Sequence, residues 1–430
     1  MNNIFRELKS QPLISGVTIV GTALSIFLIM VVVMLYNVNT IPFAPESKRD
    51  RLMHGQFIHI IGTNPDDHIN VSMSASLSYL KELYDDMPGI EEVSYAIMEL
   101  QRTDVKSVDS RPLTINLATV DDAFFRVFNF KILSGKPFDH AVSEAGIKEA
   151  VITESVARNV LGGTDVAGRE ILLHGIPYKV AAVVADISTL ASNAYADVFI
   201  SYNAVNRANE TWGLGEKTPE TGPFRAFLIR SNGVSAQEIK DETARRIEII
   251  NSRKRANDEL EIVYHNQPFT QEEVIIPHGS NSTPDLAGER KQRYASYIIL
   301  LLIPAINLSV ITQSRLRRRV SEIGVRRAFG CTRSRVIIDV LNENMLVTLI
   351  GGIIGLILSV AFAWIYCNST MPSFGILSTG SNVTAGMLIN WPTLGIAVLA
   401  CFFLNLLSAG VPAWRASRIS PVEALGGITR

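Results

Sequence analysis

The sequence predicts a membrane protein with four transmembrane α-helices and an α+β domain outside the cytoplasm. A helix needs about 20 apolar residues to cross roughly 30 Å of hydrocarbon. Four stretches reach about that length, namely Leu13 to Tyr36, Tyr294 to Ile311, Val340 to Tyr366 and Trp391 to Val411. Residues 37–293 have mixed charge and no long apolar run, and they are numerous enough to bury a core. The whole chain has 47% hydrophobic residues and a net charge of -1, because it combines apolar spans with a large segment of mixed charge.

The predicted order begins with a short amphipathic helix over residues 1–12, on the cytoplasmic side, followed by the first span over 13–36. No small-residue cleavage pattern follows this span in "YNVNTIPFAPES", so we expect a retained signal anchor. The remaining expected boundaries are 37–293 for the extracytoplasmic domain, 294–311 for the second span with a stalk extension from about 286, 312–339 for a cytoplasmic loop, 340–366 for the third span, 367–390 for an external loop, 391–411 for the fourth span and 412–430 for a cytoplasmic tail.

Arginine and lysine predict the orientation, because they are retained on the cytoplasmic side of short loops. Ser314 to Val336, called the arginine loop from here on, holds eight arginines and one acidic residue. The tail adds three more arginines, and Arg6 and Lys9 precede the first span, whereas the segment between the third and fourth spans is uncharged. We therefore expect both termini and the arginine loop in the cytoplasm and residues 37–293 outside it.

The sequence carries no sign of an enzyme active site. The pair Gly135-Lys136 lacks the spacing of a phosphate-binding P-loop, and hydrolase or zinc-protease motifs are absent. All seven histidines are scattered through the outer domain, and all three cysteines lie elsewhere, which argues against a metal site or a disulfide framework. The middles of the spans lack ionisable residues of the kind that ion-coupled carriers use. We expect a non-catalytic membrane subunit without a bound cofactor or nucleic acid.

The outer domain shows two kinds of pattern. "QFIHIIG", a helix over Ser74 to Met87 and "EEVSYAIMEL" form one strand-helix-strand segment; "FRAFLIRS", a helix over Ser235 to Arg255 and "ELEIVYH" form another. We expect these to pack as one α/β subdomain, over about 55–110 and 223–272, with a single interrupted sheet. Between them, about 111–222, runs such as "PLTINLATV", "KEAVIT" and "ADVFISY" predict a β-rich module.

Within the arginine loop, Arg318 to Phe329 predicts a short amphipathic helix that ends at Gly330, and Thr332 is a candidate cap for the next helix. Val320, Ile323, Gly324 and Ala328 share one face, and Glu322, Val325, Arg326 and Phe329 an adjacent one. Composition alone fits two interpretations equally. The helix either meets anionic membrane lipid or docks a cytoplasmic protein.

The order of residues distinguishes these interpretations. "RRRVSEIGVRRAFGCTRSRV" resembles the loop signature of the FtsX-domain permeases of ABC transporters, a family that includes the MacB macrolide exporter and the LolC and LolE lipoprotein-release proteins. "PAWRASRISPVEALGG" is similar to the family's closing motif, with Pro412, Ala413, Ala416, Pro421, Ala424 and Leu425 in register. "FFRVFNFKILSGKPF", "AVITESVARNVLGG" and "IPYKVAAVVADI" resemble the MacB-type periplasmic domain, whose α/β and β-rich parts are called porter and sabre.

The resemblance implies a bacterial inner-membrane permease whose arginine loop docks on an ABC-type ATPase. The residues that it assigns to this coupling are Arg318, Arg319, Glu322, Ile323, Gly324, Arg326, Arg327, Phe329 and Gly330. ATP and Mg would be bound by the ATPase, expected as a separate polypeptide because few residues precede the first span. Two nucleotide sites imply a second permease copy or a paralogue. A periplasmic adaptor and an outer-membrane channel are further expected partners.

The expected function is mechanotransmission, in which ATP hydrolysis moves the outer domain and drives export or efflux of an envelope substrate. A helix from about Leu286 to about Arg317 would join the loop to that domain. Pro304 removes one backbone hydrogen bond and would kink it, and Asn307 would hydrogen-bond across helices; a tolerated kink and an Asn that only packs are the equal alternative. Gly351 and Gly355 form a G-x-x-x-G pattern for packing within one subunit or for dimerisation. Two alternatives remain, an FtsX-like regulator of an envelope enzyme and a Lol-type machine that releases lipoprotein or lipid.

Overall fold

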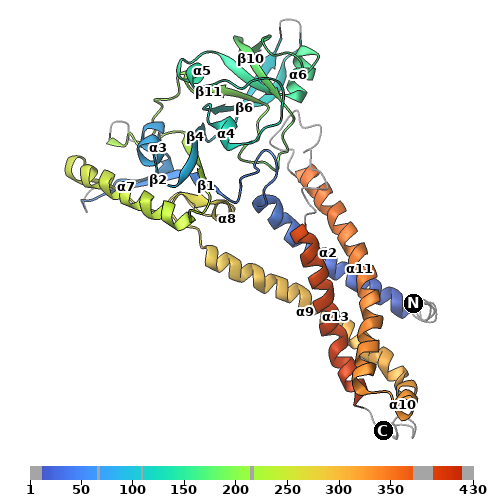
Figure 1. Cartoon of the computed structure of the whole chain (residues 1–430). Coiled ribbons are helices and arrows are strands. Elements are labelled where there is room, and N and C mark those ends of the chain that lie inside the picture. The colour runs from blue at the N-terminus through green and yellow to red at the C-terminus, as the bar shows by residue number, and fades with distance from the viewer. Residues whose placement is uncertain (1–11, 65–67, 108–109, 214–216, 371–390, 419–430) are drawn as a thin grey trace. The chain divides into compact units, whose positions relative to one another are not determined.

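The computed structural model describes residues 12–64, 68–107, 110–213, 217–370 and 391–418 (Figure 1). These residues fall into two compact units. The helical unit contains four long helices except for a few of their end residues, together with one short helix. The long helices are α2 (Pro12–Thr40), α9 (Leu286–Arg318), α11 (Arg333–Thr370) and α13 (Trp391–Ser417), and the short helix is α10 (Val320–Ala328). The large domain comprises Asn39–Leu286.

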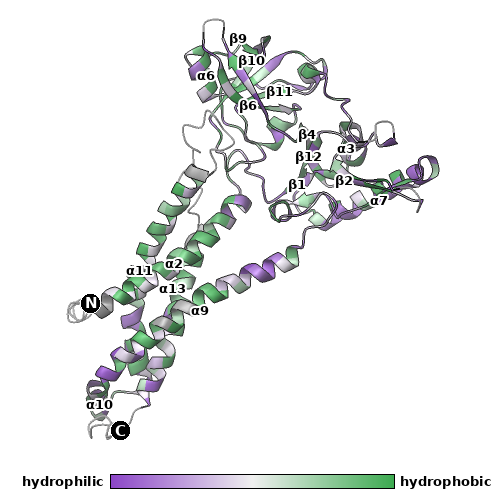
Figure 2. Cartoon of the chain, turned by 180° about the vertical axis from the view of Figure 1, so that it is seen from behind, coloured by the Kyte–Doolittle hydropathy of each residue, from purple (hydrophilic) through white to green (hydrophobic). Residues whose placement is uncertain are grey.

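Three stretches of the described helices are long and apolar enough to cross a membrane, namely Gly16–Thr40, Arg333–Cys367 and Gly395–Ser417. They overlap the first, third and fourth predicted spans. The second predicted span lies inside α9, whose early turns are strongly polar, whose middle turns are apolar and whose last turn carries Arg315, Arg317 and Arg318 (Figure 2). α9 has nearly the bounds expected for the stalk helix, but the number of four spans stays a prediction.

Small residues bring α2 and α11 close together. A Cβ added to Gly351 would lie 2.7 Å from the Thr22 Cβ, and one added to Gly355 would collide with the carbonyl oxygen of Ala23. Both glycines of the G-x-x-x-G pattern therefore face α2 of the same chain. Packing within one subunit accounts for this pattern without a second copy.

α11 also contacts α13. A Cβ on Gly352 would collide with the sulfur of Cys401, and the Asn405 Nδ2 donates to the carbonyl oxygen of Leu341 at 3.2 Å. An amide donor in an apolar setting needs such a partner, because leaving it unpaired would cost the whole hydrogen bond. α11 thus packs against both α2 and α13.

The part of the large domain formed by the two strand-helix-strand segments, called the base, has one common core. β4 pairs antiparallel with β12, β13 pairs antiparallel with β2, and Leu80, Ile239 and Ile247 lie in the same buried cluster. The bounds of its elements are β1 Leu52–Gly55, β2 Phe57–Gly62, β3 Asn70–Ser74, α3 Leu77–Tyr84, β4 Ile90–Ile97, β12 Phe224–Arg230, α7 Ala236–Asn257, β13 Leu260–Ile262, β14 Phe269–Thr270 and α8 Gln271–Val274.

The expectation of one sheet in the base was wrong. β13, β2 and β3 form a three-stranded sheet, while β4, β12, β1 and β14 belong to the larger sheet of the domain. β2 and β1 are separated by Gln56 alone, whose backbone N–H donates to the Gln267 side chain at 2.9 Å rather than to a strand. The chain therefore passes from one sheet to the other at this residue.

The intervening segment together with β5 forms a β-barrel, called the barrel below. β5 lies before residue 111, where the β-rich module was expected to begin, so that boundary was wrong. β6, β5, β9, β10, β8 and β11 pair in a closed ring, since β11 pairs with both β8 and β6. Its interior is apolar and buried, with Ile115, Ile152 and Val180 among the core residues. The bounds are β5 Gln101–Lys106, β6 Leu113–Val120, α4 Phe124–Val127, β7 Ile132–Gly135, α5 His140–Glu144, β8 Glu149–Thr153, α6 Glu154–Leu161, β9 Glu170–Leu173, β10 Ile176–Val184, β11 Val198–Ser201 and a 3₁₀ helix at Asn203–Val205.

One strand contact and an aromatic cluster are among the links that join base and barrel. β4 of the base meets β6 of the barrel at the pair Ala96 and Val120. Phe124 beside β6 packs against Phe227 of the base at 6.0 Å and against Phe199 of the barrel at 5.8 Å between ring centroids. Aromatic burial of this kind contributes more than one strand pair does, so the joint is held mainly by packing.

Candidate functional site

The arginine loop contains the predicted helix, in a shorter form. α10 covers Val320–Ala328, while Arg318 ends α9 and Arg319 is non-helical, with φ -105° and ψ 10°. The C-terminal prediction is confirmed. Gly330 has φ +95°, its N–H donates to Arg327 O at 3.1 Å, and the Cys331 N–H donates to Arg326 O at 3.1 Å. These bonds form a Schellman motif, which a left-handed glycine permits.

Thr332 begins the next helix, as predicted. Its Oγ1 accepts a hydrogen bond from the backbone N–H of Arg335 at 3.4 Å, and α11 starts at the following residue. The two helices are therefore separated only by a short turn. The residues that end α10 and begin α11, Gly330 and Thr332, lie within three positions of each other. The short connection restricts the direction of α10 relative to α11.

Arg319 explains why the chain turns before α10 although no helix breaker is present. Its Nη1 lies 2.8 Å from Glu343 Oε2 of α11, and its Nε lies 3.1 Å from Glu322 Oε2 of α10. One guanidinium thus binds carboxylates from two helices, which an uninterrupted α9 could not position. A charge-assisted pair with two acceptors also fixes the side chain more firmly than a single contact.

The inner face of α10 packs on the helical unit. Ile323 and Gly324 are buried, and the Arg327 Nη1 donates to the carbonyl oxygen of Ser417 in α13 at 3.0 Å. The apolar cluster under α10 draws residues from four helices, namely Leu316 of α9, Ile323 of α10, Val336 and Val340 of α11, and Ala413 and Ala416 of α13. α10 is therefore anchored to three long helices at once.

The outer face of α10 is exposed. Phe329 is 89% exposed and Val325 is 41% exposed. Arg326 and Glu322 lie beside them and form an ion pair at 2.6 Å. A bulky aromatic side chain at the end of a firmly anchored helix, flanked by arginine, has the composition of an interface hot spot.

The structure gathers most of the predicted site residues here. Arg319, Glu322, Ile323, Gly324, Arg326, Arg327, Phe329 and Gly330 lie in α10 or at its ends, and Arg318 lies at the end of α9.

Pro412, Ala413 and Ala416 of the tail motif are buried in α13, where the two small alanines make room for Ile323. Pro421, Ala424 and Leu425 lie outside the described residues, as do the side chains of Pro304 and Asn307. Gly351 and Gly355 contact α2 instead.

Several residues of the site were not predicted. Leu316, Val336 and Val340 form the apolar support, and Glu343 and Ser417 bind the arginines. Glu343 could have been found, because it is an acidic residue inside an apolar stretch and such a residue needs a partner. The aliphatic residues carry no comparable signal, since every span is rich in them.

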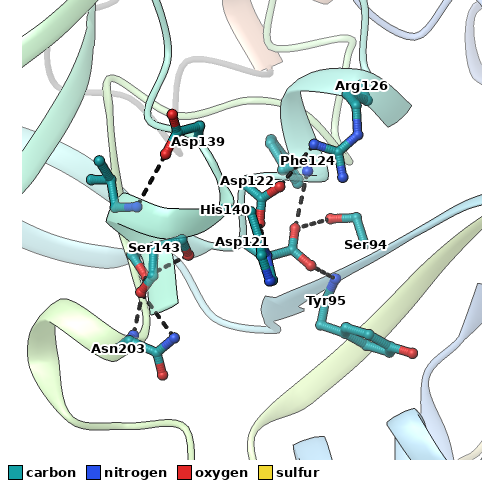
Figure 3. Close-up of polar contacts among 12 residues, drawn as sticks. Ser94, Tyr95, Asp121, Asp122, Phe124, Arg126, Asp139, His140, Ser143 and Asn203 are labelled. Atoms are coloured by element: carbon teal, nitrogen blue, oxygen red, sulfur yellow. Dashed lines mark hydrogen bonds and ion pairs between the residues drawn. The ribbon is translucent and has the colours of Figure 1, made fainter. Parts of the chain in front are cut away.

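In the large domain, no group of residues suited to a metal ion occurs among the described residues. The joint between base and barrel does hold a buried carboxylate, Asp121 (Figure 3). It accepts hydrogen bonds from the Ser94 hydroxyl at 2.7 Å, the Tyr95 N–H at 2.8 Å and the Phe124 N–H at 3.0 Å. Its donors come from both sides of the joint, which gives it a structural role.

Asp121 makes the stability of the large domain dependent on pH. Burial raises the pKa of its carboxyl from 3.8 to about 7, against the opposing effect of its hydrogen bonds. Between these values the folded domain holds a proton that the unfolded chain has released, so stability falls as pH rises from about 4 to about 7, by at most about 4 kcal/mol from this group. We expect the drop in thermal unfolding midpoint between pH 5 and pH 8 to be smaller in Asp121→Asn. An equal drop in both proteins would contradict this prediction.

Two family models match the chain. The MacB-like periplasmic core domain matches residues 15–246, and the FtsX-like permease C-terminal domain matches residues 294–421. The first covers more than half of the chain, including α2, the barrel and part of the base. The second contains α10 with the helices that support it.

Several relatives align over most of the chain. The uncharacterized ABC transporter permease YknZ of Bacillus subtilis is 20% identical over 361 residues, which are 83% of this chain and 81% of that protein. The macrolide export ATP-binding/permease protein MacB of Bordetella avium is 25% identical over 380 residues, 86% of this chain and 52% of that protein. The pyoverdine export ATP-binding/permease protein PvdT of Pseudomonas aeruginosa is 24% identical over 310 residues, 70% of this chain and 41% of that protein. The chain thus spans about half the length of the MacB relative.

Solved structures align with part of the chain. The periplasmic region of MacB from Actinobacillus actinomycetemcomitans is 16% identical and covers 48% of this chain and 88% of its own, with a TM-score of 0.32. The extracellular domain of the transporter YknZ from Gram-positive bacteria is 13% identical and covers 48% of this chain and 100% of its own, also with a TM-score of 0.32. The family models match both the large domain and the segment that carries α10, and the chain belongs to the MacB-like ABC transporter permeases with an FtsX-like C-terminal domain.

Proposed function

We propose that this chain is a permease subunit that couples ATP hydrolysis by an ABC-type ATPase to movements of its large domain, and that these movements drive export of an envelope substrate. In this proposal the chain lies in the bacterial inner membrane with four spans, both termini and the arginine loop in the cytoplasm, and the large domain in the periplasm. The ATPase binds ATP and Mg, and two permease subunits, identical or paralogous, serve its two nucleotide sites.

The proposal rests on the two faces of α10, one exposed and the other packed on the helical unit. Phe329 is 89% exposed, yet the helix before it is anchored through Ile323 to α9, α11 and α13. A partner that binds the exposed face therefore pulls on three long helices rather than on a flexible loop. Among them, α9 extends along the chain from Arg318 back to Leu286, the residue at which the large domain ends.

A helix transmits displacement because its backbone hydrogen bonds resist stretching. At 1.5 Å per residue, the 33 residues of α9 correspond to about 50 Å, some 20 Å more than the hydrocarbon core. The excess lies in its polar first turns, where Arg293 stacks on the Tyr36 ring of α2 at 3.9 Å. α2 and α9 are thus coupled near the ends that lead to the large domain.

The relatives favour export over the other family functions. The names of MacB and PvdT assign them the export of macrolides and of pyoverdine, respectively. For this chain we propose the shared reaction class, export driven by ATP hydrolysis, with a periplasmic adaptor and an outer-membrane channel as further partners.

Affinity purification of the tagged chain in mild detergent tests the proposal. We expect an ABC-type ATPase in the mass spectrum of the purified material and Mg-dependent ATP hydrolysis by the complex. The matched control is a variant that lacks the exposed face, Val325→Ser/Arg326→Ser/Phe329→Ser, which keeps the buried face of α10. A stable wild-type chain that purifies alone, without hydrolysis, would contradict the proposal.

A further inference from the structure

Gln271, the first residue of α8, lies where three separate segments of the large domain meet. Its Nε2 donates to the carbonyl oxygen of Asn39 at the end of α2, at 2.8 Å. Its Oε1 lies 2.9 Å from His54 Nε2 in β1 and 3.4 Å from Asn193 Nδ2 in the loop between β10 and β11. Gln271 is 6% exposed, so water does not compete for these bonds.

The protonation state of His54 fixes the direction of its bond. Burial lowers the pKa of this imidazole to about 3, which keeps the ring neutral at any physiological pH. A neutral ring has one N–H, and the oxygen of Gln271 is an acceptor, so Nε2 carries the hydrogen and donates. The bonds of Gln271 therefore do not change with pH, and this group of residues is a mechanical element rather than a pH sensor.

The barrel side of this group is held by a buried ion pair. Arg49 Nε lies 2.6 Å from Glu46 Oε2, and the Arg49 Nη2 donates to Leu190 O at 2.8 Å. Glu46 Oε1 accepts from the backbone N–H groups of Asn193 at 2.8 Å and Ala194 at 3.1 Å. The segment that follows α2 is therefore fixed to the barrel loop that carries Asn193.

The base side is held in a similar way. Lys240 Nζ of α7 lies 2.6 Å from Glu273 Oε1 of α8, with both side chains less than a tenth exposed. The Glu273 Oε2 also accepts from the Thr270 N–H at 2.8 Å, which closes a capping box at the start of α8. α8 is thus fixed to the base, and it precedes α9 in the chain.

We propose that Gln271 is a positioning residue that ties the end of α2, the segment leading to α9 and the barrel loop around Asn193 into one unit, so that displacement of the two helices moves base and barrel together. This inference rests on the proposed function. A buried polar group with its partners in place has one preferred geometry, because each broken bond would leave an unpaired polar atom. Without the amide, the segment that follows α2 remains bound to the barrel loop through Glu46 and Arg49, but α8, which leads to α9, loses its link to that loop through Asn193.

The test is hydrogen exchange, measured by mass spectrometry on the full chain in complex with its ATPase, with and without ATP. In wild type we expect ATP to change the exchange of residues 41–49 and 188–196 and of α9. In Gln271→Leu we expect the change in 188–196 to be smaller than in wild type, because only the contacts of Glu46 and Arg49 then hold this loop, while the change in α9 and the rate of ATP hydrolysis persist. Asn193→Ala removes the bond of its Nδ2 to Gln271 at 3.4 Å and also the bond of the same Nδ2 to Glu46 Oε2 at 3.1 Å. It should have at least the same effect and serves if Gln271→Leu does not fold.

The matched control is Asn251→Leu. Asn251 is also a buried amide, and it bridges α7 and β13 through the Ile262 N–H at 2.8 Å and the Ile262 carbonyl oxygen at 2.9 Å. This variant should lower the unfolding temperature but keep the ATP-dependent change in 188–196. If that change is as large as in wild type in both Gln271→Leu and Asn193→Ala, the role of Gln271 is refuted and the proposed function stands. If wild type shows no ATP-dependent change anywhere in the large domain, the proposed function itself is refuted.

Discussion

Replacing Phe329 with alanine is expected to weaken binding of the ATPase by about 30-fold or more, since removal of a buried interface aromatic costs about 2 kcal/mol or more. The side chain is 89% exposed in the isolated chain, so its loss leaves no cavity in the helical unit. ATP hydrolysis by the complex should fall in parallel at low ATPase concentration and recover as the ATPase is added in excess. Titration of the ATPase against the purified chain measures both effects.

Arg335→Glu is the control for a general effect of the arginine loop. Arg335 is an exposed arginine of the same loop, but it lies on the first turn of α11 and pairs with Asp339 at 3.4 Å. Arg335→Glu should weaken binding of the ATPase much less than Arg326→Glu does. Both variants change the charge by the same amount, but only Arg326 lies on the outer face of α10. Equal losses of ATPase binding from the two charge reversals would indicate that only the net charge of the loop matters. The assignment of the outer face of α10 as the docking surface would then be wrong.

Replacing Gly355 with leucine is expected to abolish the folded helical unit. A Cβ at this position would collide with the carbonyl oxygen of Ala23, and it would also lie 3.0 Å from the Ile26 Cβ. Backbone cannot move aside as a flexible side chain can, so α2 and α11 would have to separate. Overpacking of a core costs about 1–3 kcal/mol where side chains can adapt, and we expect more here.

Gly395→Leu provides the comparison for this substitution. Gly395 lies in α13 and has open space around its Cα, with no atom within 4 Å of an added Cβ. The two variants add the same side chain to an apolar helix, so expression, size-exclusion profile and unfolding temperature in detergent can be compared directly. A Gly355→Leu protein as stable as Gly395→Leu would show that α2 does not pack on this face of α11.

Local signals predicted most elements. Gly330 marks the end of α10, Thr332 the start of α11, and Ser235 with Glu238 forms the capping box that starts α7. These features depend on residues only a few positions apart, which makes them readable from the sequence. Periodicity likewise separated the buried face of α10, with Ile323, from the exposed face, with Phe329.

Features that depend on distant partners were missed. The turn at Arg319 is made by Glu343, which lies 24 residues later, and no local residue announces it. β5, whose pattern "QRTDVK" is polar, became a barrel strand because it pairs with β6 and β9. Gln271 is an ordinary polar residue in the sequence, and its partners Asn39 and Asn193 are 232 and 78 positions away.

Site-specific photocrosslinking from position 329 determines whether the exposed face of α10 contacts the ATPase. A benzophenone amino acid in place of Phe329 stands on the exposed end of α10, and the same amino acid in place of Ile249 stands on the exposed surface of α7 in the large domain. We predict that irradiation of living cells joins position 329, and not position 249, to an ABC-type ATPase. Capture of lipid alone from position 329, in a chain that is folded and present at normal levels, would show that the exposed face of α10 meets the membrane and would contradict the account.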